Sequence, residues 1–223
     1  VLFDINPRLV YASATGYGLS GPERDSLAMD LTVQAASGVM SVTGFPDGPP
    51  LKAGPAFADF ISGTHLYGAI VTALFERERT GRSRMVEVAM IDTIYPTLAS
   101  NLSMMKPDSI VPPPRTGGLA ISPYNVYPCK DGHVAIICLM EAHWMNLLKA
   151  MGREDLKDDP RFLDNAARVT HMDETDAVVE QWTKNLTRDE LFEMSRAYRL
   201  PTAPVRNLVE VMNSPHMHER DML

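Results

Sequence analysis

The chain has 223 residues and a formal net charge of −7, and 45% of its residues are hydrophobic. That apolar fraction is enough for a sizeable core and excludes a disordered chain, whereas the acidic balance excludes a nucleic-acid partner, which requires a basic face. No run approaches 18 uninterrupted apolar residues, so the sequence predicts no membrane span.

The first half of the chain predicts alternating strands and helices. An apolar run that ends in small residues predicts a buried strand, and a stripe of apolar residues at three- and four-residue steps predicts a long helix that Gly81 would end. In chain order, the expected elements are a strand at 8–16, a helix at 29–40, a helix at 60–80, a strand at 85–90 and a helix at 91–105 that tolerates Pro96.

The composition changes after residue 105. Residues 106–123 contain three consecutive prolines and a pair of glycines, which is typical of a linker. Two strands joined by a turn at 130–132 are expected next, and most of the remaining chain is helical, with a capping box at Thr187 and Glu190. We therefore predict an α/β domain at 1–105, a linker at 106–123 and a smaller α+β domain at 124–223.

The chain contains two cysteines, Cys129 and Cys138, in strand-like sequence. Their spacing matches no metal or redox motif, and they are more typical of buried thiols in a reducing compartment than of a disulfide. We therefore expect a cytoplasmic protein. The chain begins with Val and starts at once in element-like sequence, which favours an excerpt of a longer protein.

The glycines Gly16, Gly18 and Gly21 follow the first predicted strand in a G-x-G-x-x-G pattern. In a dinucleotide-binding fold such glycines let backbone amides approach a pyrophosphate. That function requires a long helix directly after the third glycine and a second strand–helix unit, and neither is evident. The pattern is therefore interpreted as a plain loop.

Asp59 stands among small and apolar residues at the expected start of the long helix. One interpretation is structural, because Asp is a favoured N-cap residue. The other is catalytic, because an ionised carboxylate at a helix N-terminus can attack an activated acyl group without a general base. Spacing alone favours the cap. Two further acids in helix-like sequence, Asp30 and Asp92, are interpreted as structural.

Four consecutive segments resemble the family III CoA-transferases. They read "NPRLVYASATGYGLSGPERD", "MDLTVQAASGVMSVTG", "GPPLKAGPAFADFISG" and "ALFERERTGRSRMVEVAMID". The resemblance covers essentially the whole chain and is densest before residue 95. It implies an acyl-CoA and a small carboxylic acid as substrates, with no cofactor other than CoA as a substrate, and neither ATP nor a metal.

The resemblance also implies roles for particular residues. It assigns the nucleophile to Asp59, in the segment "AGPAFADFISG", and places Met29 at the acyl pocket. It makes Gly117 and Gly118 candidates for a glycine-rich loop over the active site. The implied fold is a Rossmann-like large domain with a smaller domain, and the implied assembly is an interlocked homodimer.

The chain departs from the family pattern in two respects. The α-methylacyl-CoA racemase branch has a His where this chain has Met29, and a thioether cannot exchange a proton, so transfer is favoured over racemisation. Segments that precede "NPRLVYAS" in the family, and a returning C-terminal segment, are absent from this sequence. A truncated, non-catalytic fragment is therefore the other alternative.

Overall fold

The computed structural model describes residues 2–105 and 113–223, and it divides into two compact units, Val1–Arg115 and Thr116–Leu223. The division falls inside the predicted linker at 106–123, part of which lies outside the described residues. The predicted domain limits themselves stay a prediction. Among the described helices, none combines the length and the apolar character that crossing a bilayer requires.

The first unit alternates helices and strands, as the sequence predicts. Its elements are α1 (Leu2–Ile5), β1 (Tyr11–Thr15), α2 (Asp30–Ala36), η1 (Val39–Val42), α3 (Phe57–Thr80), β2 (Met85–Ala89), α4 (Met90–Ile94), η2 (Tyr95–Leu98) and α5 (Ala99–Ser103). The helix expected at 91–105 is divided into three short pieces, because Pro96 lacks the N–H that a continuous α-helix needs.

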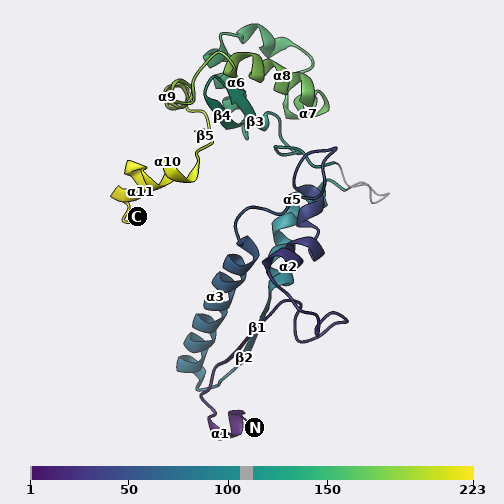
Figure 1. The fold of residues 1–223 in the computed structure, drawn as a ribbon, viewed down its shortest axis with the longest axis vertical. Helices are drawn as coiled ribbons and strands as arrows, with labels where there is room; N and C mark the ends of the chain where they lie inside the picture. The colour runs from purple at the N-terminus through teal and green to yellow at the C-terminus, as the bar shows by residue number, and fades with distance from the viewer. Residues whose placement is uncertain (1, 106–112) are drawn as a thin grey trace. The chain divides into compact units, whose positions relative to one another are not determined.

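The strands β1 and β2 pair in parallel, with Tyr11 opposite Met85 and Thr15 opposite Ala89. Parallel neighbours require a long crossover connection, and here that connection contains α2, η1 and α3. Figure 1 shows α3 running alongside the two strands. The mixed α/β class is confirmed, whereas the Rossmann-like form of a complete large domain stays a prediction.

The buried face of α3 is held against α4 by apolar and hydroxyl contacts. Ala58 and Ile94 belong to one buried cluster. Ser62 lies one turn after Ala58, and its Oγ donates to the Ala58 carbonyl at 2.6 Å and lies 2.8 Å from Thr93 Oγ1. Because both hydroxyls are buried and bonded, they fix the first turns of α3 without leaving an unpaired polar group there.

The second unit is a three-stranded antiparallel sheet with helices packed on it. Its elements are β3 (Tyr124–Cys129), β4 (Gly132–Ile137), α6 (Glu141–Met151), η3 (Glu154–Asp158), α7 (Asn165–Thr170), α8 (Met172–Thr183), α9 (Arg188–Tyr198), β5 (Thr202–Pro204), α10 (Leu208–Met212) and α11 (Pro215–Glu219). The predicted hairpin is confirmed, since β3 and β4 pair across a turn that places Cys129 opposite Gly132. The capping box is confirmed too, because Thr187 and Glu190 exchange hydrogen bonds at the start of α9.

The strand β5 is an element that the sequence analysis does not predict. Thr202 and Pro204 pair with Ile136 and Val134 at the edge of the sheet. A three-residue strand has too little periodicity to recognise. Pro204 within β5 and Pro201 directly before it are typical of irregular structure, although proline is compatible with an edge strand.

A buried arginine organises the core of the second unit. Arg168 is fully buried, and its guanidinium makes a two-pronged contact with Glu141 at 2.8 and 3.0 Å. Its Nε also donates to the Ser122 carbonyl at 2.8 Å, and the guanidinium lies 5.0 Å from the centre of the Trp144 ring. Arginine suits this position because its planar group can donate several hydrogen bonds and stack on an aromatic face at once.

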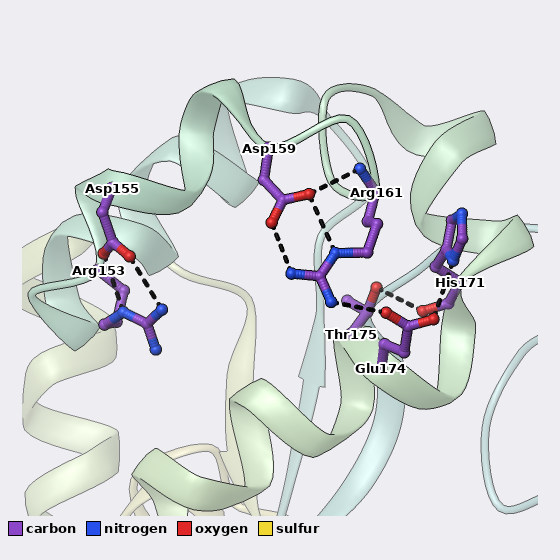
Figure 2. A network of polar contacts seen from close by, with 7 residues as sticks. All are labelled: Arg153, Asp155, Asp159, Arg161, His171, Glu174 and Thr175. Carbon is purple, nitrogen blue, oxygen red and sulfur yellow. Dashed lines mark hydrogen bonds and ion pairs between the residues drawn. The ribbon is translucent and has the colours of Figure 1, made fainter.

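A second ionic network lies on the surface of this unit (Figure 2). Arg161 forms a two-pronged contact with Asp159 and also donates to Glu174, which accepts from His171. The Arg161 side chain and backbone N–H lower the pKa of Asp159 to about 2. These contacts tie the segment before α7 to the first turn of α8.

Candidate active site

Asp59 lies inside the first turn of α3 and does not cap the helix. The helix begins at Phe57, three residues earlier than predicted, and Ala56 is its N-cap residue. The prediction that Asp59 is the cap is therefore wrong. Its carboxylate is exposed, and among the described residues it forms no hydrogen bond and no ion pair. The positive end of the helix dipole favours a negative charge at this position.

An open hollow of about 410 Å³ adjoins Asp59. It is lined by one face of the first three turns of α3: Asp59, Phe60, Gly63, Thr64 and Tyr67. Phe60 and Tyr67 are 77% and 70% exposed, and nothing lies within 4 Å of the point where a side chain on Gly63 would begin. The volume is in the range of small-molecule sites, so a bulky reactant has room to approach the carboxylate.

The N-terminus of α3 is capped by Asp30, which the sequence interpretation treated only as a structural acid of its own helix. Asp30 is the first residue of α2, is 7% exposed, and its Oδ1 accepts the Ala58 N–H at 3.0 Å. Its Oδ2 accepts from Gln34 Nε2 at 2.8 Å and lies 3.0 Å from Lys52 Nζ. Burial alone would raise the pKa of the Asp30 carboxyl, but the hydrogen bonds and the Lys52 charge outweigh burial and lower that pKa.

Lys52 extends the same network to the segment that leads into α3. Besides meeting Asp30, its Nζ donates to the carbonyls of Ala53, Gly54 and Pro55 at 2.7, 3.2 and 3.1 Å. The Ala53 N–H donates in turn to Gln34 Oε1 at 3.0 Å. The loop before the helix is therefore fixed by two side chains, and the backbone enters α3 in one defined direction.

Met29 is the residue before Asp30, and it is 72% exposed. Its backbone N–H donates to Thr32 Oγ1 at 2.9 Å, which closes the first turn of α2. The bond between Asp30 and Ala58 joins the starts of α2 and α3. Met29 and Asp59 are each adjacent in sequence to one of the bonded residues, but Met29 does not line the hollow beside Asp59.

Gly117 and Gly118 belong to the second unit, where they lie against β3. The Gly118 N–H donates to the Tyr124 carbonyl at 2.9 Å, and a side chain on Gly117 would begin 1.8 Å from that same oxygen. Gly117 also helps to line an apolar hollow of about 340 Å³ on this unit, with Val126 and Ala135. Glycine is thus required here for close backbone packing, and its function above an active site stays a prediction.

The G-x-G-x-x-G loop is already occupied by groups of this chain. The Gly18 N–H donates to Thr15 Oγ1 at 2.9 Å, and the Leu19 N–H donates to the Glu87 carboxylate. No helix begins within the described residues between Gly21 and Asp30. The helix that a dinucleotide site requires directly after the third glycine is therefore missing from this described segment, which agrees with the interpretation as a plain loop.

Comparison with known proteins adds family evidence to this geometry. The family model described as CoA-transferase family III matches residues 1–223. The succinate–glutarate CoA-transferase of Agrobacterium fabrum is 34% identical over 98% of this chain and 55% of its own length. The formyl-CoA:oxalate CoA-transferase of Streptomyces avermitilis is 31% identical over 99% of this chain and 58% of its own length.

Solved structures agree with the sequence relatives. The hypothetical protein Rv3272 from Mycobacterium tuberculosis superposes with a TM-score of 0.86 at 29% identity, over 99% of this chain and 59% of that one. A CAIB/BAIF family protein from Brucella suis gives a TM-score of 0.78 at 32% identity, also over 99% and 59%. The chain therefore spans little more than half the length of these relatives.

Proposed function

The chain belongs to CoA-transferase family III, and we propose that it moves CoA from an acyl-CoA to a small carboxylic acid through Asp59. The observation that supports this role is the exposed carboxylate in the first turn of α3, which has no partner among the described residues and faces an open hollow. A carboxylate tied to a cation would be a weaker nucleophile. The names of the relatives, which pair CoA with succinate, glutarate or oxalate, support the class of acceptor.

The proposed reaction uses only carboxylates and the thioester. An oxygen of Asp59 attacks the carbonyl carbon of the acyl-CoA, and the C–S bond breaks. CoA departs as its thiolate, and Asp59 and the acyl group are joined in a mixed anhydride. The thiolate then attacks the Asp59 carbonyl carbon, which releases the donor acid and forms an aspartyl-CoA thioester. The acceptor carboxylate attacks that thioester and expels the thiolate again. In the last step the thiolate attacks the acceptor carbonyl of this second anhydride, which forms the new acyl-CoA and releases the Asp59 carboxylate.

The surroundings of Asp59 suit the first step. Its charge lies at the positive end of α3, where an anion is favoured, and no general base is needed because a carboxylate has no proton to lose at neutral pH. Each attack creates an oxyanion that requires hydrogen-bond donors. We also propose that the glycine-rich segment at Gly117 and Gly118 covers the active site. The proposed working assembly is an interlocked homodimer, and the proposed location is the cytoplasm.

Met29 favours transfer over racemisation. Racemisation at the α-carbon needs two groups that exchange protons, and the thioether of Met29 cannot be one of them. Met29 is exposed beside the joined starts of α2 and α3, where it is suited to contact an acyl group.

The test is to trap the covalent intermediate on the protein. After incubation with short, branched and dicarboxylic acyl-CoAs, borohydride reduces an aspartyl thioester to an alcohol. Trypsin then releases residues 53–77, whose acidic side chains are Asp59 and Glu76. We expect the reduced residue at Asp59 and no product with Asp59→Asn. The same modification in Asp59→Asn, or its absence from the wild-type protein with every acyl-CoA, would refute the role.

A further inference from the structure

The carboxylate of Asp30 connects three segments that meet at the start of α3. It accepts hydrogen bonds from the Ala58 N–H of α3 and from Gln34 of α2, and it pairs with Lys52 of the intervening loop. The Asp30 side chain is nearly buried, whereas its partner Lys52 is partly exposed. The proposed reaction gives Asp30 no chemical task.

The contact with Ala58 bears directly on Asp59, the next residue. Ala56, at the N-cap position of α3, has no side-chain group that can accept a hydrogen bond. Among the described residues, Asp30 is the side chain that accepts a backbone N–H from the first turn of α3. Because the cap holds the Phe57–Ala58 peptide, which lies one residue before Asp59, it helps to set the direction in which the Asp59 side chain leaves the helix.

The contact with Lys52 has an electrostatic consequence. Lys52 is the cation nearest to Asp59 along the sequence on its N-terminal side, and its ammonium group is held by Asp30 and by three carbonyls of residues 53–55. A cation held in this way is not available to Asp59. Among the described residues, no cation pairs with the Asp59 carboxylate in the first turn of α3, whereas the Asp30 carboxylate is paired with Lys52.

We infer that Asp30 is a positioning residue for the nucleophile: it orients Asp59 through the Ala58 amide and keeps Lys52 away from the reacting carboxylate. The inference rests on the proposed function of Asp59. An attacking oxygen displaced by about 1 Å can cost on the order of 100-fold in rate. Loss of this network should therefore lower the rate of covalent attachment much more than the affinity for acyl-CoA.

The first test is Asp30→Asn, which keeps an acceptor for the Ala58 N–H but removes the charge that holds Lys52. We expect aspartyl-CoA formation to slow by about 10- to 100-fold per folded molecule, with the KM for acyl-CoA changed less than about threefold. Asp92→Asn is the matched control, because Asp92 is an exposed acid in the first turn of α4 in the same unit. It should keep the wild-type rate.

The second test separates positioning from mere stability. Adding Lys52→Gln to Asp30→Asn removes the ammonium group that has lost its counter-charge, so we expect part of the lost rate to return. A role in stability alone predicts a further loss instead. If Asp30→Asn does not fold, Lys52→Gln alone serves as the variant, and it should slow attachment about tenfold, because the loop before α3 loses its tie. A wild-type rate per folded molecule in Asp30→Asn, or in this substitute, overturns the inference.

A third measurement does not depend on the chemistry. Hydrogen exchange of the Ala58 amide should be at least about tenfold faster in Asp30→Ala than in wild type, because the acceptor is gone. Faster exchange without any adduct on the wild-type protein means that the proposed function fails while the link to α3 holds. Unchanged exchange means that Asp30 does not fix the start of α3, and the inference fails on its own.

Discussion

Gly117→Ala is expected to destabilise the second unit by about 1.5–4.5 kcal/mol. The new Cβ would begin 1.8 Å from the Tyr124 carbonyl oxygen and 2.7 Å from the Asn125 Cα, both backbone atoms of β3 that cannot swing aside. To reach ordinary contact at 3.4 Å, the segment must retreat by about 1.6 Å. That movement breaks the Gly118 N–H···O bond to Tyr124, which is worth about 0.5–1.5 kcal/mol, and adds an overpacking cost of about 1–3 kcal/mol.

Gly118→Ala is the matched control for this prediction. The three atoms nearest to its Cβ would belong to the ring of Tyr124, the first at 2.4 Å, and that side chain is exposed and can rotate away. We expect it to cost less than about 1 kcal/mol. Denaturant unfolding followed by tryptophan fluorescence reports on this unit, because both tryptophans, Trp144 and Trp182, lie in it. Equal stabilities of the two variants would refute the backbone-clash argument.

Three further outcomes follow from the second unit. Burial raises the pKa of Cys138 to about 12, so iodoacetamide at pH 8 should label this thiol only after unfolding, as peptide mapping would show. Arg161 holds the pKa of Asp159 at about 2, below the unfolded value of about 3.9. Arg161→Gln should therefore lower the free energy of unfolding at pH 7, and this difference from wild type should shrink as the pH falls from 4 towards 2. Denaturant titrations at several pH values measure the difference. Glu141→Gln leaves the fully buried Arg168 without its counter-charge and should lower the free energy of unfolding by about 2 kcal/mol. The loss is smaller than for an ion pair in which both partners are buried, because Glu141 is exposed to solvent.

Local patterns predicted most of the secondary structure. The long helix α3 was predictable because its apolar residues recur at helical spacing. The first residue of α9 was predictable because the capping residue Thr187 is followed three residues later by Glu190. The hairpin of β3 and β4 was predictable for the same reason, since a two-residue turn separates alternating strands. In each case the residues that decide the structure are close together in sequence.

The candidate site was harder to predict because its partners are distant in sequence. Asp59 was assigned to the cap of α3 since a favourable cap residue was expected near the first apolar turn, whereas Ala56 and Phe57 give no start signal. The group that caps the helix, Asp30, precedes Ala58 by 28 residues. No local spacing rule relates two such positions, so only the packing of α2 on α3 could reveal the contact.

Substitution of the two acids at the start of α3, Asp59 and Asp30, should have different effects on the free energy of unfolding. Asp59 is exposed and has no partner among the described residues, so Asp59→Asn removes only the interaction with the helix dipole and should lower the unfolding free energy by less than about 1 kcal/mol. Asp30→Asn breaks a nearly buried ion pair with Lys52 and should cost about 1–3 kcal/mol. Chemical denaturation of both variants gives the comparison. A large loss in Asp59→Asn would mean that its carboxylate has a structural partner and is not free to act as a nucleophile.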